Sequence, residues 1–156
     1  MSSPISPQRT ERDTSDGQLR PRPPVIALIN STPDVIEMLR IAFEYAGFVV
    51  VSTYTFLIRQ GEINIEAFIQ QHQPEAIVYD IAPPYTSNWQ LFEHVCQLPG
   101  VKGRPFVLTS TNPARVRELA KTDEAIFEIV ETPYQIMQLV DVVRQAARRP
   151  SATRSE

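Results

Sequence analysis

Short apolar runs alternate with amphipathic segments along this chain, and no other feature of the sequence constrains the fold as strongly. The runs have the length of strands and are rich in β-branched residues, which is typical of strands buried on both faces. They fall at residues 25–29, 48–53, 76–79, 106–109 and 127–130. Strands that alternate with helices over short connections predict right-handed βαβ units, and therefore a parallel α/β sheet.

The segments between these runs carry the helical pattern. The first predicted helix begins at Pro33 and ends before Gly47, with one apolar stripe on Val35, Met38, Leu39, Ala42 and Ala46. Further helices are predicted at 65–72, around 91–98, at 113–120 with Asn112 as its cap, and from 133 onward. Residues 54–62 fit neither pattern, because the segment is apolar at first and is then broken by Gly61.

Composition and charge limit the classes of function. The 156 residues are 42% hydrophobic, which predicts one globular domain. The net charge of -3 argues against a nucleic-acid or membrane-surface partner, since both need a clustered positive face. No apolar run approaches the roughly 20 residues that span a bilayer. Cys96, the single cysteine, is predicted to be a buried thiol and fits a reducing compartment, so we expect a cytoplasmic protein.

The two ends of the chain differ in composition from its middle. Residues 1–24 are rich in Ser, Thr, Pro and charge and carry few apolar side chains, so they predict a disordered tail. Residues 149–156 predict a second tail. The folded domain is therefore expected at residues 25–148.

Ligands of an open parallel sheet bind beyond the carboxyl ends of its strands. The polar residues predicted at that edge are Asn30, Ser31, Asp80, Thr109 and Thr132. No glycine-rich phosphate loop follows residues 25–29, which argues against an unrelated nucleotide-binding enzyme.

At these positions the chain resembles the response-regulator receiver (CheY-like) family, over residues 25–148. Residues 74–84 (PEAIVYDIAPP) are similar to the family's third strand, its phosphoacceptor aspartate and the proline that follows. Further matches, in the family's order, lie at residues 29–34 (INSTPD), 89–91 (WQL), 108–110 (LTS) and 132–134 (TPY). The resemblance implies a flavodoxin-like three-layer sandwich with a five-stranded parallel sheet in the order 2-1-3-4-5.

The chain departs from the family where the family carries charge. The acidic pair after the first strand is here Asn30 and Ser31, and the lysine after the fifth strand is here Thr132. The Asp-Gly pair that often opens the third helix is Ser87-Asn88, and the aromatic signalling position is Ile129. The pocket loses both signs of charge, which predicts a nearly neutral site that is easy to desolvate.

These departures predict a changed function. Family members use Mg²⁺ to transfer a phosphoryl group to the aspartate, and Mg²⁺ prefers carboxylate oxygens. Only Asp80 and the neutral amide of Asn30 remain as possible ligands, so we expect no cofactor, no metal and no enzymatic activity. We interpret the chain as an atypical (pseudo-)receiver of two-component phosphorelay signalling that binds proteins without being phosphorylated. The alternative is a functional single-domain response regulator, phosphorylated on Asp80 with weak Mg²⁺ assistance.

Each site residue also has a structural interpretation. Asp80 is either the phosphoacceptor or a carboxylate bonded to Thr109 and nearby amides. Asn30 and Ser31 are expected to act as turn and helix-cap residues, and Thr132 to form a capping box with Gln135. Separately, the two histidines, His72 and His94, are predicted on exposed helical faces, and Trp89 is predicted to be a packing residue.

The expected partner is a histidine kinase or another signalling protein. In the family, the fourth helix, fifth strand and fifth helix form the signalling face. Here that face would display side chains of both charge signs: Arg115, Glu118, Lys121, Gln138, Asp141 and Arg144. Such a face suits a homodimer with a two-fold axis, and it equally suits an ordinary solvated surface.

Overall fold

The computed structural model describes residues 22–121, 124–132 and 136–149. Five parallel strands form one sheet in the order β2-β1-β3-β4-β5, which confirms the predicted topology. The strands are β1 (Val25–Asn30), β2 (Val49–Tyr54), β3 (Ala76–Asp80), β4 (Phe106–Ser110) and β5 (Ile126–Glu131). The tails predicted at 1–24 and 149–156 lie almost entirely outside the described residues.

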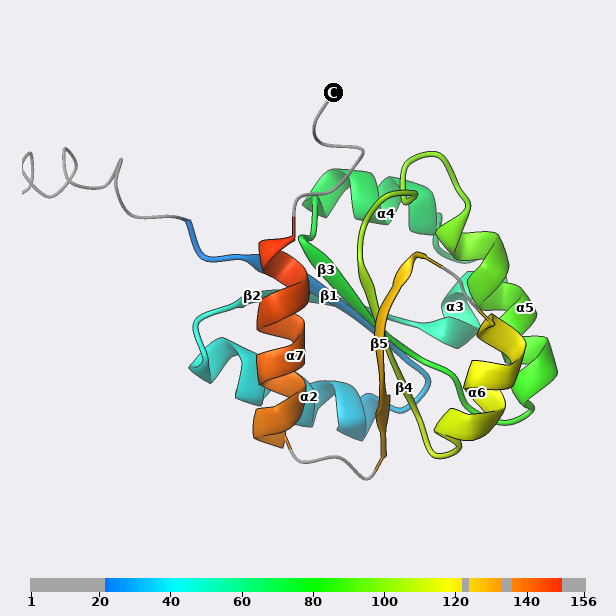
Figure 1. Ribbon diagram of the computed structural model, residues 1–156. Coiled ribbons are helices and arrows are strands. Elements are labelled where there is room, and N and C mark those ends of the chain that lie inside the picture. The colour runs from blue at the N-terminus through cyan, green and yellow to red at the C-terminus, as the bar shows by residue number, and fades with distance from the viewer. Residues whose placement is uncertain (1–21, 122–123, 133–135, 150–156) are drawn as a thin grey trace, which may run out of the picture.

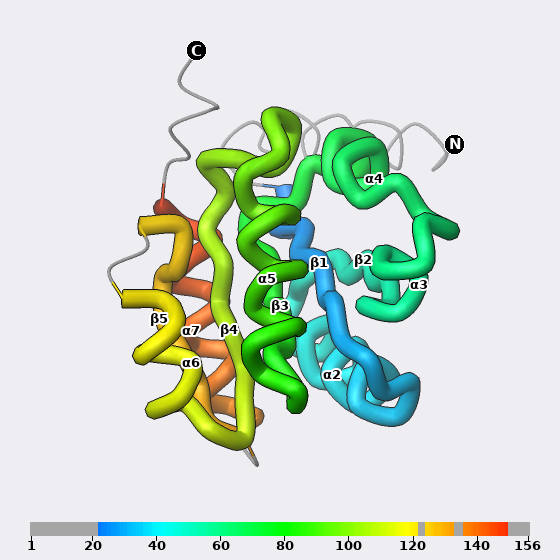
Figure 2. Tube along the Cα trace, turned by 90° about the vertical axis from the view of Figure 1, so that its right-hand side faces the viewer, coloured from blue at the N-terminus to red at the C-terminus, as the bar shows by residue number. Residues whose placement is uncertain are grey.

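Helices cover both faces of the sheet and complete the three predicted layers. They are α2 (Pro33–Tyr45), α3 (Thr55–Arg59), α4 (Ile65–His72), α5 (Tyr85–Cys96), α6 (Pro113–Ala120) and α7 (Ile136–Arg148). Figure 1 shows α2 and α7 on one face, with α4, α5 and α6 on the other. Figure 2 views the second face directly, and α3 lies there beside α4.

The sheet separates two apolar cores. One contains the buried faces of α2 and α7, and the other contains those of α4, α5 and α6. The second core holds an aromatic cluster, in which the ring of Phe92 lies 5.1 Å from that of Tyr79 and 5.0 Å from that of Phe106. Trp89 and Cys96 are buried in the same core, which confirms both predictions. Strand β3 is buried from its first residue up to Tyr79, directly before the half-buried Asp80.

The predicted apolar stripe of α2 is wrong in part. The buried residues are Ile36, Leu39 and Phe43, whereas Met38 is 44% exposed. The two stripes share Leu39, but the helix is rotated about its axis by an angle close to that between successive residues, ~100°. The observed orientation buries the large side chains of Ile36 and Phe43, where the predicted stripe has Ala42 and Ala46. Burying more apolar area stabilises a helix more.

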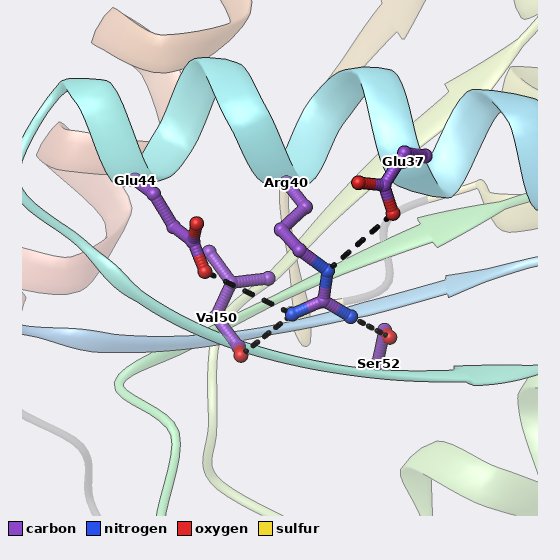
Figure 3. Close-up of polar contacts among 5 residues, drawn as sticks. All are labelled: Glu37, Arg40, Glu44, Val50 and Ser52. Carbon is purple, nitrogen blue, oxygen red and sulfur yellow. Dashed lines mark hydrogen bonds and ion pairs between the residues drawn. The ribbon is translucent and has the colours of Figure 1, made fainter.

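The Arg40 side chain links α2 to the edge strand β2 by hydrogen bonds (Figure 3). Its guanidinium donates to the carbonyl oxygen of Val50 at 3.1 Å and to Ser52 Oγ at 2.5 Å. Glu37 and Glu44, one turn away on either side along α2, lie 4.0 and 3.9 Å from it. These contacts fix the helix that follows Asn30 against the sheet.

The segment that the sequence left undecided forms a short helix and a turn. Helix α3 ends at Arg59, and Gly61 then adopts a φ of +76°, which glycine reaches without steric cost. Asn64 caps α4 by accepting a hydrogen bond from the Ala67 N–H at 3.0 Å. The consequence for function is that Arg59 lies at the carboxyl edge of the sheet.

The prediction for the histidines holds for one of the two. His94 is exposed, whereas His72 is half-buried with its ring 4.8 Å from that of Phe68. Phe68 lies one turn earlier on α4, and the two rings meet edge to face at an interplanar angle of 60°.

Candidate functional site

Asp80 ends β3 at the carboxyl edge of the sheet and lies directly beside Thr109 of β4 in the strand register. The Thr109 hydroxyl donates a hydrogen bond to Asp80 Oδ1 at 2.6 Å. Thr109 is buried, and Asp80 is half-buried. This bond is the pairing of aspartate and threonine that the sequence predicted as one of two roles for Asp80.

Burial raises the pKa of Asp80 above its ordinary value, and the hydrogen bond from Thr109 acts in the opposite direction. The second carboxylate oxygen, Oδ2, has no hydrogen-bond partner among the described residues. The folded protein therefore disfavours the charge on Asp80, and a donor or a cation brought to Oδ2 would relieve that cost.

A cavity of about 420 Å³ opens on the α2 side of Asp80. It brings together three of the predicted site residues, Asp80, Asn30 and Thr132. The rest of its described wall is mostly apolar: Thr32, Val35, Met38, Ile81, Ala82, Pro83, Thr111 and Ile136. Asp80 is the only charged side chain among these lining residues.

Asn30 closes the turn between β1 and α2. Its Oδ1 accepts a hydrogen bond from the Thr32 N–H at 3.0 Å, which is the geometry of an Asx turn. The turn role predicted for Asn30 is therefore confirmed. The helix-cap role is wrong for Ser31, because α2 has Thr32 at its N-cap and no side-chain cap. Ser31 is exposed at the tip of the turn.

Thr132 follows β5 and is half-buried, with its N–H donating to the Ser110 carbonyl oxygen at 2.8 Å. This bond extends the pairing of β4 and β5 by one residue and places Thr132 on the cavity wall. The capping box predicted with Gln135 falls on a residue outside the described ranges.

A second cavity, of about 130 Å³, lies on the other side of Asp80, against α3. Its wall consists of Ser31, Thr55, Phe56, Arg59, Tyr79, Asp80, Ala82, Pro83 and Asn88. Arg59 donates to Asn88 Oδ1 at 2.5 Å and to Ser87 Oγ at 3.4 Å. All five predicted site residues thus lie at this edge of the sheet, four of them lining one or both cavities and Thr109 bonded to Asp80.

Sequence reasoning missed Arg59 and Tyr79. Arg59 belongs to the undecided segment 54–62, so nothing placed it near the site. Tyr79 was assigned only as a strand residue, yet a tyrosine within an otherwise aliphatic buried strand is a usable signal, because its hydroxyl needs a partner. That hydroxyl has none among the described residues.

Neither a metal cluster nor a membrane span is found in the described parts of the chain. No three His, Cys, Asp or Glu residues there lie close enough together to hold a metal ion. No described helix combines the length and the apolarity needed to cross a membrane.

Comparison with known proteins gives a clear answer only at the level of structure. No family model and no curated protein matches the sequence. Among solved structures, a putative response regulator from Chloroflexus aurantiacus is 20% identical, with a TM-score of 0.63 over 81% of this chain and 99% of that one. The fold is that of a receiver domain.

Two further receiver structures agree. A CheY-like receiver domain from Methylobacillus flagellatus is 18% identical, with a TM-score of 0.61 over 80% of this chain and 98% of its own. The receiver domain of an HD domain-containing protein from Pseudomonas fluorescens is 15% identical, with a TM-score of 0.64 over 86% of this chain and 100% of its own. These matches confirm the predicted CheY-like, flavodoxin-type architecture.

The face predicted for signalling differs from expectation at two arginines. Arg144 turns toward α2 and β2, where its guanidinium lies 5.1 Å from the centre of the Phe48 ring and donates to the Ala46 carbonyl oxygen at 3.4 Å. Arg115 bonds within the chain to Glu118, at 3.2 Å, and to Thr86. The apolar ring and carbonyl available to Arg144 explain why it leaves the face. Lys121, Gln138 and Asp141 remain exposed.

Proposed function

We propose that this chain is an atypical receiver domain of two-component signal transduction, which acts as a protein-interaction module without phosphorylation of Asp80. The receiver fold supports a role in signalling, since receiver domains are the structures it resembles. Fold alone leaves the mode of action open, so the proposal rests on the site.

The observation that carries the proposal is the engagement of Asn30. Mg²⁺ in such a site needs several hard oxygen ligands, usually including one or two carboxylates. Asp80 supplies one carboxylate, and the only other side-chain oxygen expected to help already accepts the Thr32 N–H. A single carboxylate and one amide oxygen that is already partly engaged are fewer hard oxygen ligands than Mg²⁺ takes, so the donor set does not fit this ion. Thr132 in place of a lysine further removes a cation from the α2 side of the site.

The alternative, a working response regulator phosphorylated on Asp80, keeps one supporting observation. The Thr109 hydroxyl lies 2.6 Å from Asp80 and would still be within reach of a phosphoryl group attached there. One hydrogen bond compensates little for the missing carboxylates and for the lysine that Thr132 replaces, so this function is the less favoured of the two.

Treatment with a phosphodonor separates the two functions. The full chain is incubated with acetyl phosphate, with and without millimolar Mg²⁺, and its intact mass is measured; an Asp80→Asn variant and a fully active receiver serve as controls. We expect no added phosphoryl mass on this chain under conditions that phosphorylate the active receiver. A stoichiometric phosphoryl adduct that is lost in Asp80→Asn would establish the alternative.

An interaction module needs a surface that is available without a switch. On α2, Met38, Ile41 and Tyr45 are 44%, 61% and 94% exposed, and their spacing places them along one side of the helix. By contrast, Arg115 and Arg144 are engaged within the chain. We therefore place the partner contact on this apolar stripe of α2, with the apolar face of a partner helix as its occupant.

Sedimentation tests whether the partner is a second copy of the chain and which surface it uses. The wild type is compared with an Ile41→Glu variant and with the charge-reversed Glu118→Arg, Asp141→Arg variant at high micromolar concentration. Association that only Ile41→Glu abolishes would support the α2 stripe as the interface. Association abolished only by the charge reversal would restore the dimer face predicted from sequence. A monomeric wild type would exclude a second copy as the partner.

A further inference from the structure

The cavity beside α3 gathers polar groups whose hydrogen-bonding capacity is unused. Tyr79 is 1% exposed, lines this cavity, and has a hydroxyl without a partner among the described residues. Leaving a buried hydroxyl unsatisfied costs free energy, so such a group in a native protein needs an explanation. A ligand that hydrogen-bonds this hydroxyl provides one.

Arg59 supplies positive charge to the same cavity. Its guanidinium has five N–H donors, and the described residues accept from it at Ser87 and Asn88 only. Burial raises the pKa of Tyr79, and the charge of Arg59 acts against that rise, as expected for a cation near the phenol. An oxyanion in the cavity could therefore accept from Arg59 and from the Tyr79 hydroxyl together.

Asp80 sets a second requirement on the ligand. Its carboxylate is part of the same wall, and its Oδ2 has no partner among the described residues. A simple anion would meet the charge of Asp80 unfavourably. A ligand that also carries an ammonium group would pair with Asp80, so that both charges of the wall, Arg59 and Asp80, would face an opposite charge.

We propose that this cavity binds a small zwitterion of the α-amino acid class. Its carboxylate accepts hydrogen bonds from Arg59 and Tyr79, and its ammonium group faces Asp80. The volume of about 130 Å³ is that of about four water molecules at ~30 Å³ each, which admits a ligand the size of glycine or alanine. Such a site would couple binding of a metabolite to the loop after β3, through the unmodified Asp80 carboxylate.

Binding is measured on the full chain by NMR titration and calorimetry with glycine, L-alanine and L-serine. Acetate and methylammonium, each carrying half of the charge pattern, are the comparison ligands. We expect dissociation constants roughly between micromolar and millimolar for at least one amino acid, because so small a ligand makes few contacts. Shifted resonances should fall on Arg59, Tyr79 and Asp80, and both comparison ligands should bind at least about tenfold more weakly.

Two variants test the contacts, each with a matched control. Tyr79→Phe removes only an unsatisfied hydroxyl, so the variant should fold with no loss of stability, yet bind at least about tenfold more weakly. Arg59→Gln should weaken binding at least as much. Tyr85→Phe and Arg115→Gln alter the same residue types outside the cavity wall and should leave affinity unchanged. The proposal is overturned if no amino acid binds at millimolar concentration, if acetate binds as well, or if Tyr79→Phe retains full affinity.

Discussion

Replacing Thr109 by valine isolates the one hydrogen bond that the described residues give to the side chain of Asp80. The side chain keeps its shape, so no cavity forms, but Asp80 Oδ1 loses its donor. Hydrogen bonds to charged groups contribute about 1.5–3 kcal/mol. Because Asp80 is half-buried and can recruit water, we expect the free energy of unfolding to fall by about 1.5–2 kcal/mol, the lower part of that range.

The pH dependence gives this loss a signature. Burial raises the folded-state pKa of Asp80 above the unfolded value of 3.8, so the folded chain binds its proton more tightly than the unfolded chain does. Asp80 therefore lowers stability as pH rises through the window that begins near 3.8 and extends upward. Thr109 stabilises the charged form, so the cost of Thr109→Val should be larger above that window than below it.

Urea unfolding followed by circular dichroism, at mildly alkaline and at mildly acidic pH, measures both effects. Thr109→Ser keeps the hydroxyl and is the control for the methyl group. In an Asp80→Asn background the cost of Thr109→Val should shrink toward the roughly 1 kcal/mol of a neutral hydrogen bond. A loss below about 0.5 kcal/mol at alkaline pH, or one that is the same in the Asp80→Asn background, would refute the assigned role of Thr109.

Three further predictions concern stability. Asp80→Asn should raise the free energy of unfolding at mildly alkaline pH and remove part of the fall in stability with pH, because it deletes a buried charge; equal pH profiles for variant and wild type would contradict this. Arg40→Met should cost about 1–2 kcal/mol in chemical denaturation through its lost bonds to β2, whereas Arg117→Met on the exposed face of α6 should cost little. Phe92→Ala should cost about 3–5 kcal/mol in the same assay, and a cost under 1 kcal/mol would show that the aromatic cluster is not closely packed.

The sequence by itself determined the order and type of most elements. Each strand is an apolar run long enough to be buried on both faces, and each long helix carries an apolar stripe, so local patterns carry this information. The same holds for residues at fixed points of those patterns. Asp80 and Thr109 had to meet, because adjacent parallel strands end at the same edge of the sheet. Asn112 had to cap α6, because it immediately precedes the helical proline.

Only the tertiary structure decided how helices rotate and which side chains converge from distant segments. The local sequence of α2 offers two overlapping apolar stripes, and packing between the sheet and α7 selects the one with Ile36 and Phe43. Arg59 reaches the site because Gly61 and the Asn64 cap turn the chain after α3, and the partner it finds, Asn88, lies 29 positions away. The unpaired Tyr79 hydroxyl is likewise decided by packing, because whether a hydroxyl has a partner depends on every residue around it in space. Local periodicity thus determined the framework, whereas long-range contacts determined the chemistry at its edge.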